Sequence, residues 1–208
     1  MNIDTLRALG NIQLDSKGGN DISNLPIAGT RPPKDDEAGY WSKRSNDRMY
    51  LMAVLFANFY TRRKETVADV GCHCSPLVLM LPDFKRRFAF DPSPQAAKAW
   101  ADVDGATFVN SILAPEMVRP LINDDKFDLV ICNQVIEHLE EPEEFATTLC
   151  NVSRKLILST TFETEKGVIE GHVQDPISLD KFEGWFPRKM QQCFISRGPT
   201  VHKILAVF

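Results

Sequence analysis

A carboxylate and an imidazole stand side by side at Glu137-His138, shortly after an apolar run that ends at Cys132. A second imidazole, His172, follows the next apolar run along the chain. Imidazoles ordinarily titrate at about pH 6.5, so a neutral histidine is a suitable general base for a substrate hydroxyl. We therefore expect His138 and His172 to be the catalytic candidates. The competing interpretation for each is a histidine with a structural role.

The run Phe127–Cys132 is followed at once by two polar side chains, Asn133 and Gln134. Short apolar runs of this kind are typical of buried strands. In an open α/β sheet the ligand crevice lies outside the carboxyl ends of the strands, so a strand that turns polar there delivers groups to a site. A polar loop without a ligand is the alternative interpretation.

A glycine turn follows another apolar run, Val67–Val70, and reads Gly71-Cys-His-Cys-Ser-Pro76. Ser75 followed by Pro76 is typical of a helix amino terminus, with serine as the N-cap and proline in the first turn. The free N–H groups of such a terminus favour a carboxylate. We expect this turn to approach a ligand, and a turn that merely joins strand to helix is the alternative.

Asp91 closes the short apolar run Phe88–Phe90 and lies twenty positions after Gly71. A carboxylate at the end of a neighbouring strand accepts hydrogen bonds from the vicinal hydroxyls of a ribose. We therefore expect Asp91 to bind a ribose. The alternative interpretation is that Asp91, in the sequence Asp91-Pro-Ser-Pro94, is a helix cap.

The elements that must position these residues alternate along the chain. Apolar runs separated by helical or polar stretches predict a largely parallel sheet with right-handed crossovers. The runs lie at Val67–Val70, Phe88–Phe90, Thr107–Val109, Phe127–Cys132, Leu156–Ser159 and Val201–Phe208. We expect an α/β fold: a Rossmann-like doubly wound sheet, mostly parallel with an antiparallel C-terminal strand, with helices on both faces.

Residues 1–44 are rich in glycine, proline and charge and predict an N-terminal arm or lid, whereas residues 45–208 form the Rossmann-like domain. Three helices of that domain are predicted from their caps and apolar spacing. They start at Ser45, Pro142 and Ser178.

The segment from Phe127 to His138 resembles the fourth-strand segment of class I S-adenosylmethionine-dependent methyltransferases, especially their small-molecule branch. In that family the first glycine turn reads Asp-x-Gly-x-Gly-x-Gly. Asp69 and Gly71 match this pattern, whereas His73 and Ser75 replace the second and third glycines. A Cβ at these two positions restricts the conformations that the backbone can adopt. It also limits how closely the backbone can approach a ligand.

The resemblance implies a site and an activity. It implies S-adenosylmethionine as cofactor, S-adenosylhomocysteine as product, and a small-molecule acceptor; we expect O-methylation of a metabolite, sugar or lipid-like substrate. Asn110 or Ser111 stands where relatives carry an acidic residue against the adenine amino group. The residues that we assign to cofactor binding are Asp69, Gly71, Cys72, His73, Asp91, Pro92, Ser111, Asn133, Gln134 and Val135.

Two other functions stay open. Because His73 and Ser75 replace two glycines of the family pattern, one alternative is a methyltransferase-like module that binds cofactor poorly or not at all and acts as a binding or partner subunit. A Rossmann dehydrogenase is a more distant alternative, because its phosphate turn needs glycines that are absent here. Neither the acceptor nor the oligomeric state follows from the sequence.

Composition narrows the partners and the compartment. The 208 residues carry a net charge of −4, which provides no basic face for a nucleic-acid backbone, so we expect no nucleic-acid partner. No apolar run approaches the about 20 residues that span a bilayer, and the amino terminus does not have the pattern of a signal peptide. The five cysteines are an odd number, typical of free thiols in a reducing compartment. We therefore expect a cytoplasmic protein without a membrane span.

The sequence Cys72-His73-Cys74 raises the question of a metal, and Cys132 ends a strand expected to neighbour the first one. Structural zinc needs about four ligands, usually supplied by Cys-x-x-Cys pairs. Here the two cysteines are separated by one residue and a second pair is missing. We therefore expect no metal in this protein.

Overall fold

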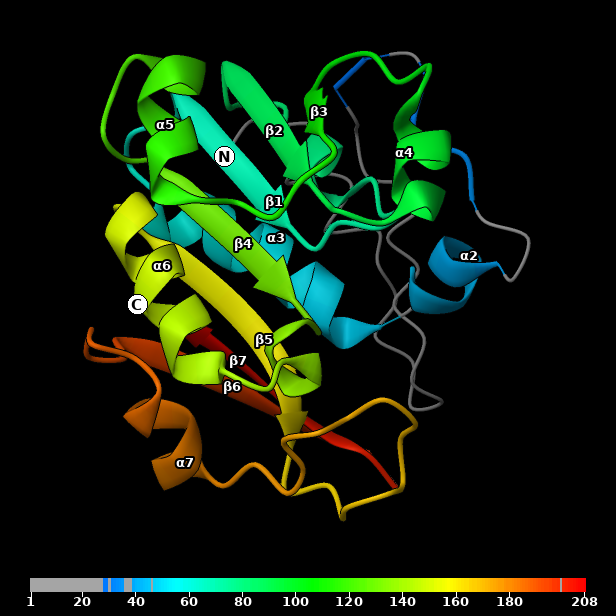
Figure 1. Ribbon diagram of the computed structural model, residues 1–208, viewed down its shortest axis with the longest axis vertical. Coiled ribbons are helices and arrows are strands. Elements are labelled where there is room, and N and C mark those ends of the chain that lie inside the picture. The colour runs from blue at the N-terminus through cyan, green and yellow to red at the C-terminus, as the bar shows by residue number, and fades with distance from the viewer. Residues whose placement is uncertain (1–27, 30, 36–38, 46, 199) are drawn as a thin grey trace.

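The computed structural model describes residues 28–29, 31–35, 39–45, 47–198 and 200–208. Its centre is a seven-stranded sheet with the strand order β3-β2-β1-β4-β5-β7-β6 (Figure 1). The strands are β1 (Thr66–Val70), β2 (Arg86–Phe90), β3 (Thr107–Val109), β4 (Leu129–Asn133), β5 (Leu156–Phe162), β6 (Gln192–Arg197) and β7 (His202–Val207). Strands β1 to β5 run parallel, and β7 is antiparallel to both β5 and β6. The predicted fold class is confirmed.

The strand order brings β1 and β4 together in the middle of the sheet. The chain builds outward from β1 to β3 and then returns to the other side of β1, so the order reverses between β1 and β4. In open α/β sheets this reversal point is where ligands bind, at the carboxyl ends of the strands. Strand β6 was not predicted, because an edge strand that is only partly buried carries a weak apolar pattern.

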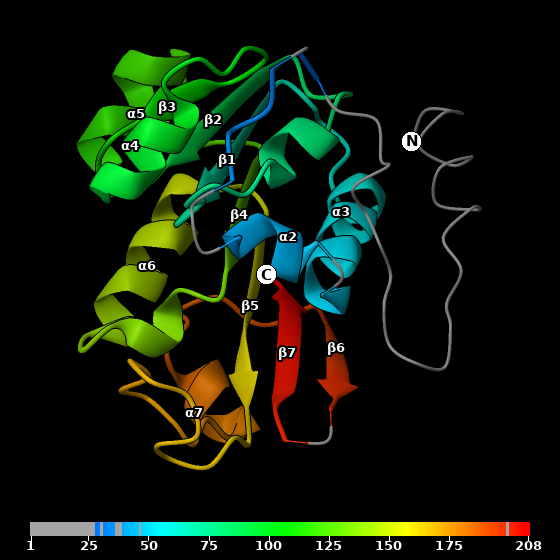
Figure 2. The same ribbon diagram turned by 90° about the vertical axis from the view of Figure 1, so that its right-hand side faces the viewer.

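Helices cover both faces of the sheet (Figure 2). On one face α3, the 3₁₀ turn η1 and α4 form one apolar core with the strands, and on the other face α5, α6 and α7 form a second. Among the described residues no helix is long and apolar enough to cross a membrane. The helices are α2 (Tyr40–Arg44), α3 (Arg48–Tyr60), η1 (Leu77–Met80), α4 (Pro94–Trp100), α5 (Pro115–Ile122), η2 (Ile136–His138), α6 (Pro142–Val152) and α7 (Leu179–Gly184).

Two of the three predicted helix starts are confirmed. Helix α6 begins at Pro142, and α7 follows Ser178, whose side chain accepts a hydrogen bond from the Lys181 amide. The predicted start at Ser45 is wrong, because Ser45 is the C-cap of α2. The N-cap of α3 is Asp47, which accepts a hydrogen bond from the Met49 amide, and an aspartate satisfies that amide as well as a serine does.

The described part of the N-terminal segment lies against the domain. The Ala28 amide donates to the Leu79 carbonyl oxygen at 2.7 Å. The Asp35 carboxylate accepts a hydrogen bond from the Trp41 amide at 2.7 Å, which fixes the start of α2. Residues 1–27 of the predicted arm lie outside the described residues. The division at residue 45 stays a prediction.

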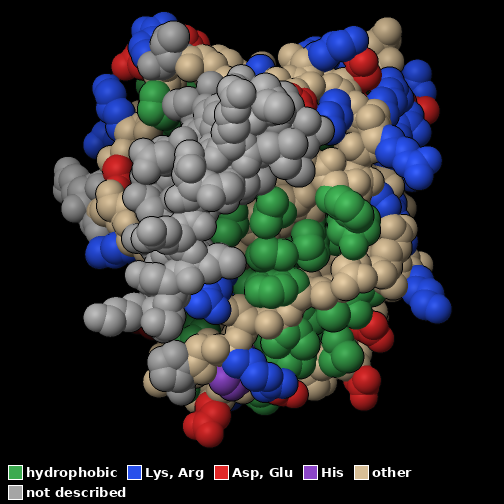
Figure 3. Space-filling view, turned by 180° about the vertical axis from the view of Figure 1, so that it is seen from behind, with side chains coloured by type: hydrophobic (Ala, Val, Ile, Leu, Met, Phe, Trp, Pro, Cys, Tyr) green, Lys and Arg blue, Asp and Glu red, His purple; other side chains and the backbone are tan. Residues whose placement is uncertain are grey.

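The outer side of α3 is apolar. Figure 3 shows apolar side chains gathered on the face behind the sheet, where α3 lies. Met52, Leu55 and Phe56 pack only partly against the core, and Phe59 is 75 % exposed. Helix α3 therefore carries apolar side chains well beyond the stripe that packs on the sheet.

Asp128 ties together the amino ends of β1 and β4. Its side chain is 2 % exposed and accepts hydrogen bonds from the backbone amides of Glu65 at 3.0 Å and Thr66 at 3.1 Å. The guanidinium groups of Arg63 and Arg154 lie 3.3 and 3.5 Å from its other oxygen. This carboxylate fixes the register of the two central strands at the end opposite the candidate site.

Replacing Asp128 by Ala should lower the free energy of unfolding by about 1–3 kcal/mol, because two buried backbone amides lose their acceptor. Urea unfolding followed by circular dichroism measures this loss. Asp125→Ala is the matched control, since its ion pair with Arg119 lies on the surface and should contribute at most about 1 kcal/mol. Equal losses in the two variants would contradict the role of Asp128.

Candidate active site

The turn after β1 adopts a left-handed backbone at two residues. Gly71 has φ +76°, and a Cβ there would lie 2.2 Å from Cγ2 of Val135, so only glycine fits against the segment that follows β4. His73 has φ +46°, a left-handed conformation that is uncommon for residues other than glycine, although asparagine, aspartate and histidine adopt it more often than other residues do. His73 thus takes a backbone conformation that favours glycine, although it carries a side chain.

Two hydrogen bonds and a ring contact help to hold His73 in this conformation. Its amide donates to Oδ2 of Asp91 at 2.9 Å, and its carbonyl oxygen accepts from Nε1 of Trp100 at 2.6 Å. Its ring lies against the ring of Tyr40, with centroids 4.5 Å apart. A left-handed residue of this type costs about 1–2 kcal/mol, which two hydrogen bonds and a ring contact are sufficient to offset. Neither Trp100 nor Tyr40 was predicted to support the turn.

The helix predicted after Ser75-Pro76 is much shorter than expected. The chain forms the single 3₁₀ turn η1, and Pro76 occupies its N-cap position. The Ser75 hydroxyl accepts a hydrogen bond from the Leu77 amide at 3.2 Å. The prediction of a helix whose amino terminus faces the crevice is therefore wrong beyond this one turn.

The Asp91 carboxylate joins the turn to the end of β2. One oxygen accepts from the His73 amide and the other from the Ser93 amide, each at 2.9 Å. The helix cap of α4 is Ser93, which accepts from the Ala96 amide at 3.2 Å, so the alternative role of Asp91 as that cap is excluded. Each carboxylate oxygen has a further lone pair, so Asp91 can accept ribose hydroxyls while it holds the turn.

The ends of β2 and β3 lie beside each other at this site. The Asp91 amide donates to the Val109 carbonyl oxygen at 3.3 Å, which brings Pro92 and Ser111 to the same edge. Asn110 donates from its side chain to the Asp91 carbonyl oxygen at 2.8 Å and therefore supports the backbone around Asp91. The Ser111 hydroxyl contacts only its neighbour among the described residues, by donating to the Ile112 carbonyl oxygen at 3.1 Å.

Two buried polar groups at the ends of β1 and β4 have an atom without a hydrogen-bond partner among the described residues. These atoms are Oδ2 of Asp69 and Nδ2 of Asn133, whose residues are 2 % and 4 % exposed. Ile131 pairs with Asp69 across the two strands, and Asn133 follows Ile131 by two positions, so both polar side chains point to the same face. A buried acceptor and a buried donor thus stand near each other at the carboxyl edge.

Burial, reinforced by the negative charge of Asp91, raises the pKa of Asp69 to about 8. At neutral pH Asp69 is therefore mostly a neutral carboxylic acid. A positively charged group placed beside it would favour the carboxylate.

Gln134 and Val135 shape the segment after β4. Gln134 has φ +56°, and its amide donates to the Ser159 carbonyl oxygen at 2.9 Å. The Ser159 hydroxyl donates to Oδ1 of Asn133 at 2.7 Å. Val135 contacts Gly71, so the segment after β4 packs directly on the turn after β1. The structure thus places these predicted residues at the carboxyl edge of the sheet, beside the turn after β1.

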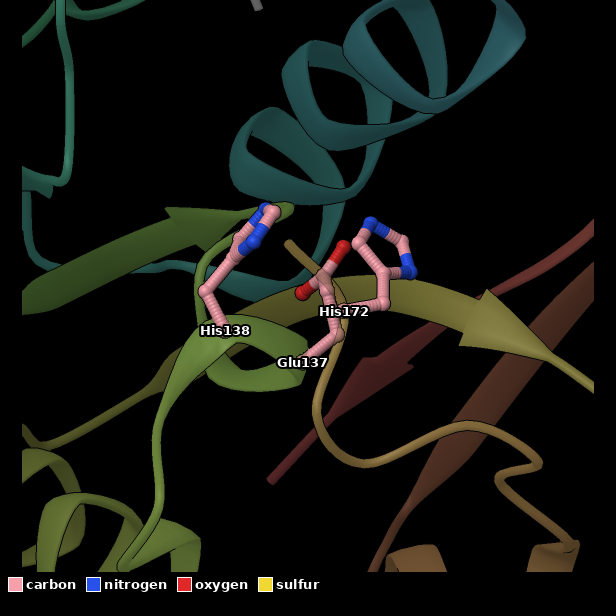
Figure 4. Close-up of side chains that lie close together, drawn as sticks. All are labelled: Glu137, His138 and His172. Atoms are coloured by element: carbon pink, nitrogen blue, oxygen red, sulfur yellow. The ribbon is translucent and has the colours of Figure 1, made fainter. Parts of the chain in front are cut away.

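The predicted catalytic candidates lie together, and a buried carboxylate joins them (Figure 4). One nitrogen or oxygen atom from each of Glu137, His138 and His172 lies within 4.8 Å of the other two. The two imidazole rings meet edge to face, with centroids 4.7 Å apart. Oε2 of Glu137 accepts from the Thr160 hydroxyl at 3.0 Å, whereas Oε1 has no hydrogen-bond partner among the described residues. Burial raises the pKa of Glu137 above its ordinary value.

Both histidines are oriented through Nδ1. Nδ1 of His138 lies 3.0 Å from the Gly171 carbonyl oxygen, and Nδ1 of His172 lies 2.8 Å from Oδ2 of Asp175. These partners accept hydrogen bonds, so each Nδ1 carries the proton and each Nε2 is left as an acceptor in a neutral ring. Asp175 lies three residues after His172, and this spacing is the signal that sequence reasoning missed.

The turn Cys72-His73-Cys74 has its thiols buried in the core at 1 % exposure. Nδ1 of His73 lies 3.2 Å from Sγ of Cys74. All five cysteines are free thiols in the structure. The absence of a metal at this turn stays a prediction.

The unfolding free energy should fall as pH rises from about 4 to 8, because native Asp69 keeps a proton that the unfolded chain releases above its ordinary pKa near about 3.9. The decline is at most about 1.4 kcal/mol per pH unit and levels off above pH 8. Denaturant unfolding at several pH values should show a smaller decline for Asp69→Asn, which cannot ionise. Parallel curves for the two proteins would contradict a protonated Asp69.

The chain is similar to several known proteins. Residues 68–156 match the family described as methyltransferase domain. The chain is 26 % identical over 163 residues to the ubiquinone biosynthesis O-methyltransferase of Rickettsia prowazekii (strain Madrid E). This alignment covers 74 % of this chain and 62 % of that protein. The corresponding protein of Rickettsia felis is also 26 % identical, with 64 % of its length covered. The chain thus spans less than two thirds of the length of each of these relatives.

Solved structures share the fold. The magnesium protoporphyrin IX methyltransferase from Synechocystis PCC 6803 with bound S-adenosylhomocysteine matches with a TM-score of 0.58 at 14 % identity, over 84 % of this chain and 87 % of that one. A SAM-dependent methyltransferase from Aquifex aeolicus matches with a TM-score of 0.57 at 17 % identity, over 84 % of this chain and 99 % of that one. The chain is thus similar to S-adenosylmethionine-dependent methyltransferases in its matched domain, in its relatives and in its fold.

Proposed function

We propose that this protein transfers a methyl group from S-adenosylmethionine to a hydroxyl of a small-molecule acceptor. The observation that carries the proposal is the pair of unsatisfied buried atoms, Oδ2 of Asp69 and Nδ2 of Asn133, at the carboxyl edge of the two central strands. Buried polar atoms without partners are rare in folded proteins, and a bound ligand that satisfies both atoms would explain these two. An amino acid moiety offers both a donor and an acceptor, which matches the methionine part of the cofactor.

The remaining cofactor contacts follow from the strand order. Asp91 accepts the ribose hydroxyls at the end of β2, and Pro92 and Ser111 lie beside it toward the adenine. Gly71, Cys72 and His73 present their backbone to the methionine part. Gln134 and Val135 close the crevice from the side of β4. The residues present therefore fit the group that the family uses.

The acceptor belongs on the side of Glu137, His138 and His172. The cofactor supplies a methyl group that is already activated, so the protein must align the acceptor oxygen and provide for the loss of its proton. The cluster follows β4 and β5 at the same edge of the sheet as the cofactor residues. His138 is exposed, whereas the side chain of His172 is only 5 % exposed, so an acceptor reaches the cluster from the side of His138.

A small acceptor fits the charge of the chain better than a nucleic acid does. The net charge of −4 provides no electrostatic attraction to a phosphate backbone. Free thiols at all five cysteines favour the cytoplasm as the compartment. The curated relatives are named O-methyltransferases, which favours oxygen as the methylated atom.

Cofactor binding should weaken by about 1–3 kcal/mol in Asp91→Ala, because the ribose hydroxyls lose their acceptor. Isothermal titration calorimetry with S-adenosylhomocysteine measures the change. Asp102→Ala is the control, since its carboxylate is exposed and pairs only with Lys34 among the described residues. A melting curve for each variant separates lost binding from lost folding. If wild-type protein bound neither cofactor form at millimolar concentration, the non-catalytic partner module would replace the enzyme.

Replacing His138 or His172 by Ala should reduce turnover by about 10²–10⁴-fold while leaving cofactor affinity unchanged. The assay records S-adenosylhomocysteine formed with a panel of hydroxylated small molecules. A histidine with a purely structural role would instead lower the melting temperature and reduce turnover little. Near-normal turnover in both variants would remove the histidines from the catalytic machinery.

A further inference from the structure

The side chains of Glu137, His138 and His172 together offer ligand atoms for one metal ion. Two imidazole nitrogens and one carboxylate oxygen are a combination that binds first-row divalent metals and leaves coordination positions open. The three atoms already lie within 4.8 Å of one another. Ligands of one cation are about 3–3.5 Å apart at metal–ligand distances near 2.1 Å, so a small side-chain movement is sufficient.

The hydrogen bonds around the cluster match those of metal-binding histidines. Such histidines usually donate the second ring N–H to a carboxylate or a backbone carbonyl, which fixes the tautomer and the ring orientation. His172 does so to Asp175 at 2.8 Å, and His138 does so to the Gly171 carbonyl oxygen at 3.0 Å. Among the described residues neither Nε2 has a hydrogen-bond partner, so both nitrogens can bind a cation.

Glu137 supplies an independent indication of a cation. The residue is 0 % exposed, and its Oε1 has no hydrogen-bond partner among the described residues. An unpaired buried carboxylate oxygen is unfavourable unless a cation or a donor satisfies it. The Thr160 hydroxyl orients the other oxygen, and exposed His138 leaves the cluster open to solvent on one side.

We propose that Glu137, His138 and His172 bind one first-row divalent cation, whose open position receives the acceptor oxygen. The role of the cation in methyl transfer rests on the proposed function, whereas its binding does not. The sequence-based expectation of no metal considered only the cysteine-rich turn, and His172 is too far from Glu137 along the chain for spacing to reveal this set.

The bound cation would serve as a Lewis acid toward the acceptor hydroxyl. The acceptor O–H bond breaks, and its proton leaves to solvent on the exposed side of His138. The resulting oxygen anion forms a bond to the methyl carbon, the carbon–sulfur bond breaks, and its electron pair stays on sulfur to give S-adenosylhomocysteine. In this arrangement the histidines position the cation and do not accept the proton themselves.

Manganese binding tests the site without cofactor or acceptor. The full chain, stripped of metal with a chelator, is titrated with Mn²⁺, and electron paramagnetic resonance measures the free ion. We expect one bound ion per chain. His138→Ala and Glu137→Gln should each lose more than about 100-fold in affinity, and Asp175→Asn, which weakens only the orientation of His172, about 10–100-fold. Glu140→Gln removes a nearby exposed carboxylate and should bind as wild type does.

Two results would overturn the proposal: failure of wild-type protein to bind Mn²⁺ or Zn²⁺ at millimolar concentration, or wild-type affinity in both His138→Ala and Glu137→Gln. Melting curves with and without the ion identify a variant that fails to fold, and Asp175→Asn then provides the remaining comparison. Metal binding without cofactor binding would refute only the proposed function. Cofactor binding without metal binding would refute only this inference.

Discussion

The site depends on one carboxylate that connects two strand ends. Asp91 accepts a hydrogen bond from the turn after β1 through the His73 amide and another from its own strand end through the Ser93 amide, each at 2.9 Å. These bonds fix the turn over the point where the strand order reverses. The same point brings Asp69 and Asn133 to one face, because β1 and β4 are neighbours in the sheet. The fold thus brings these polar groups together at one edge of the sheet.

The replaced glycines explain the unusual support of the turn. Glycine adopts positive φ without a steric penalty, whereas His73 needs the Asp91 and Trp100 hydrogen bonds and the Tyr40 ring to remain at φ +46°. Gly71 is retained where the contact with Val135 leaves no space for a side chain. The chain therefore preserves the backbone shape of the turn while substituting side-chain contacts for conformational freedom.

The sequence predicted every strand except β6, and it predicted that polar residues gather at the carboxyl edge of the sheet, because these features depend on local patterns. Apolar runs that end in polar residues marked β1, β2 and β4, and the caps at Pro142 and Ser178 marked α6 and α7. The unpredicted features depend on contacts between distant segments. Trp100 reaches His73 across 27 positions, and the cluster of Glu137 with His172 forms only when the loops after β4 and β5 meet. The shortened η1 turn shows that a good cap does not guarantee a long helix.

A crystal structure of the full chain with S-adenosylhomocysteine tests the central claim most directly. We predict that the ribose hydroxyls lie within hydrogen-bond distance of the Asp91 carboxylate and that the amino group of the ligand contacts Oδ2 of Asp69. His73 should keep its left-handed backbone and its contact with Asp91. A ligand bound away from the ends of β1, β2 and β4, with Asp69 and Asn133 still unsatisfied, would contradict the proposed cofactor site.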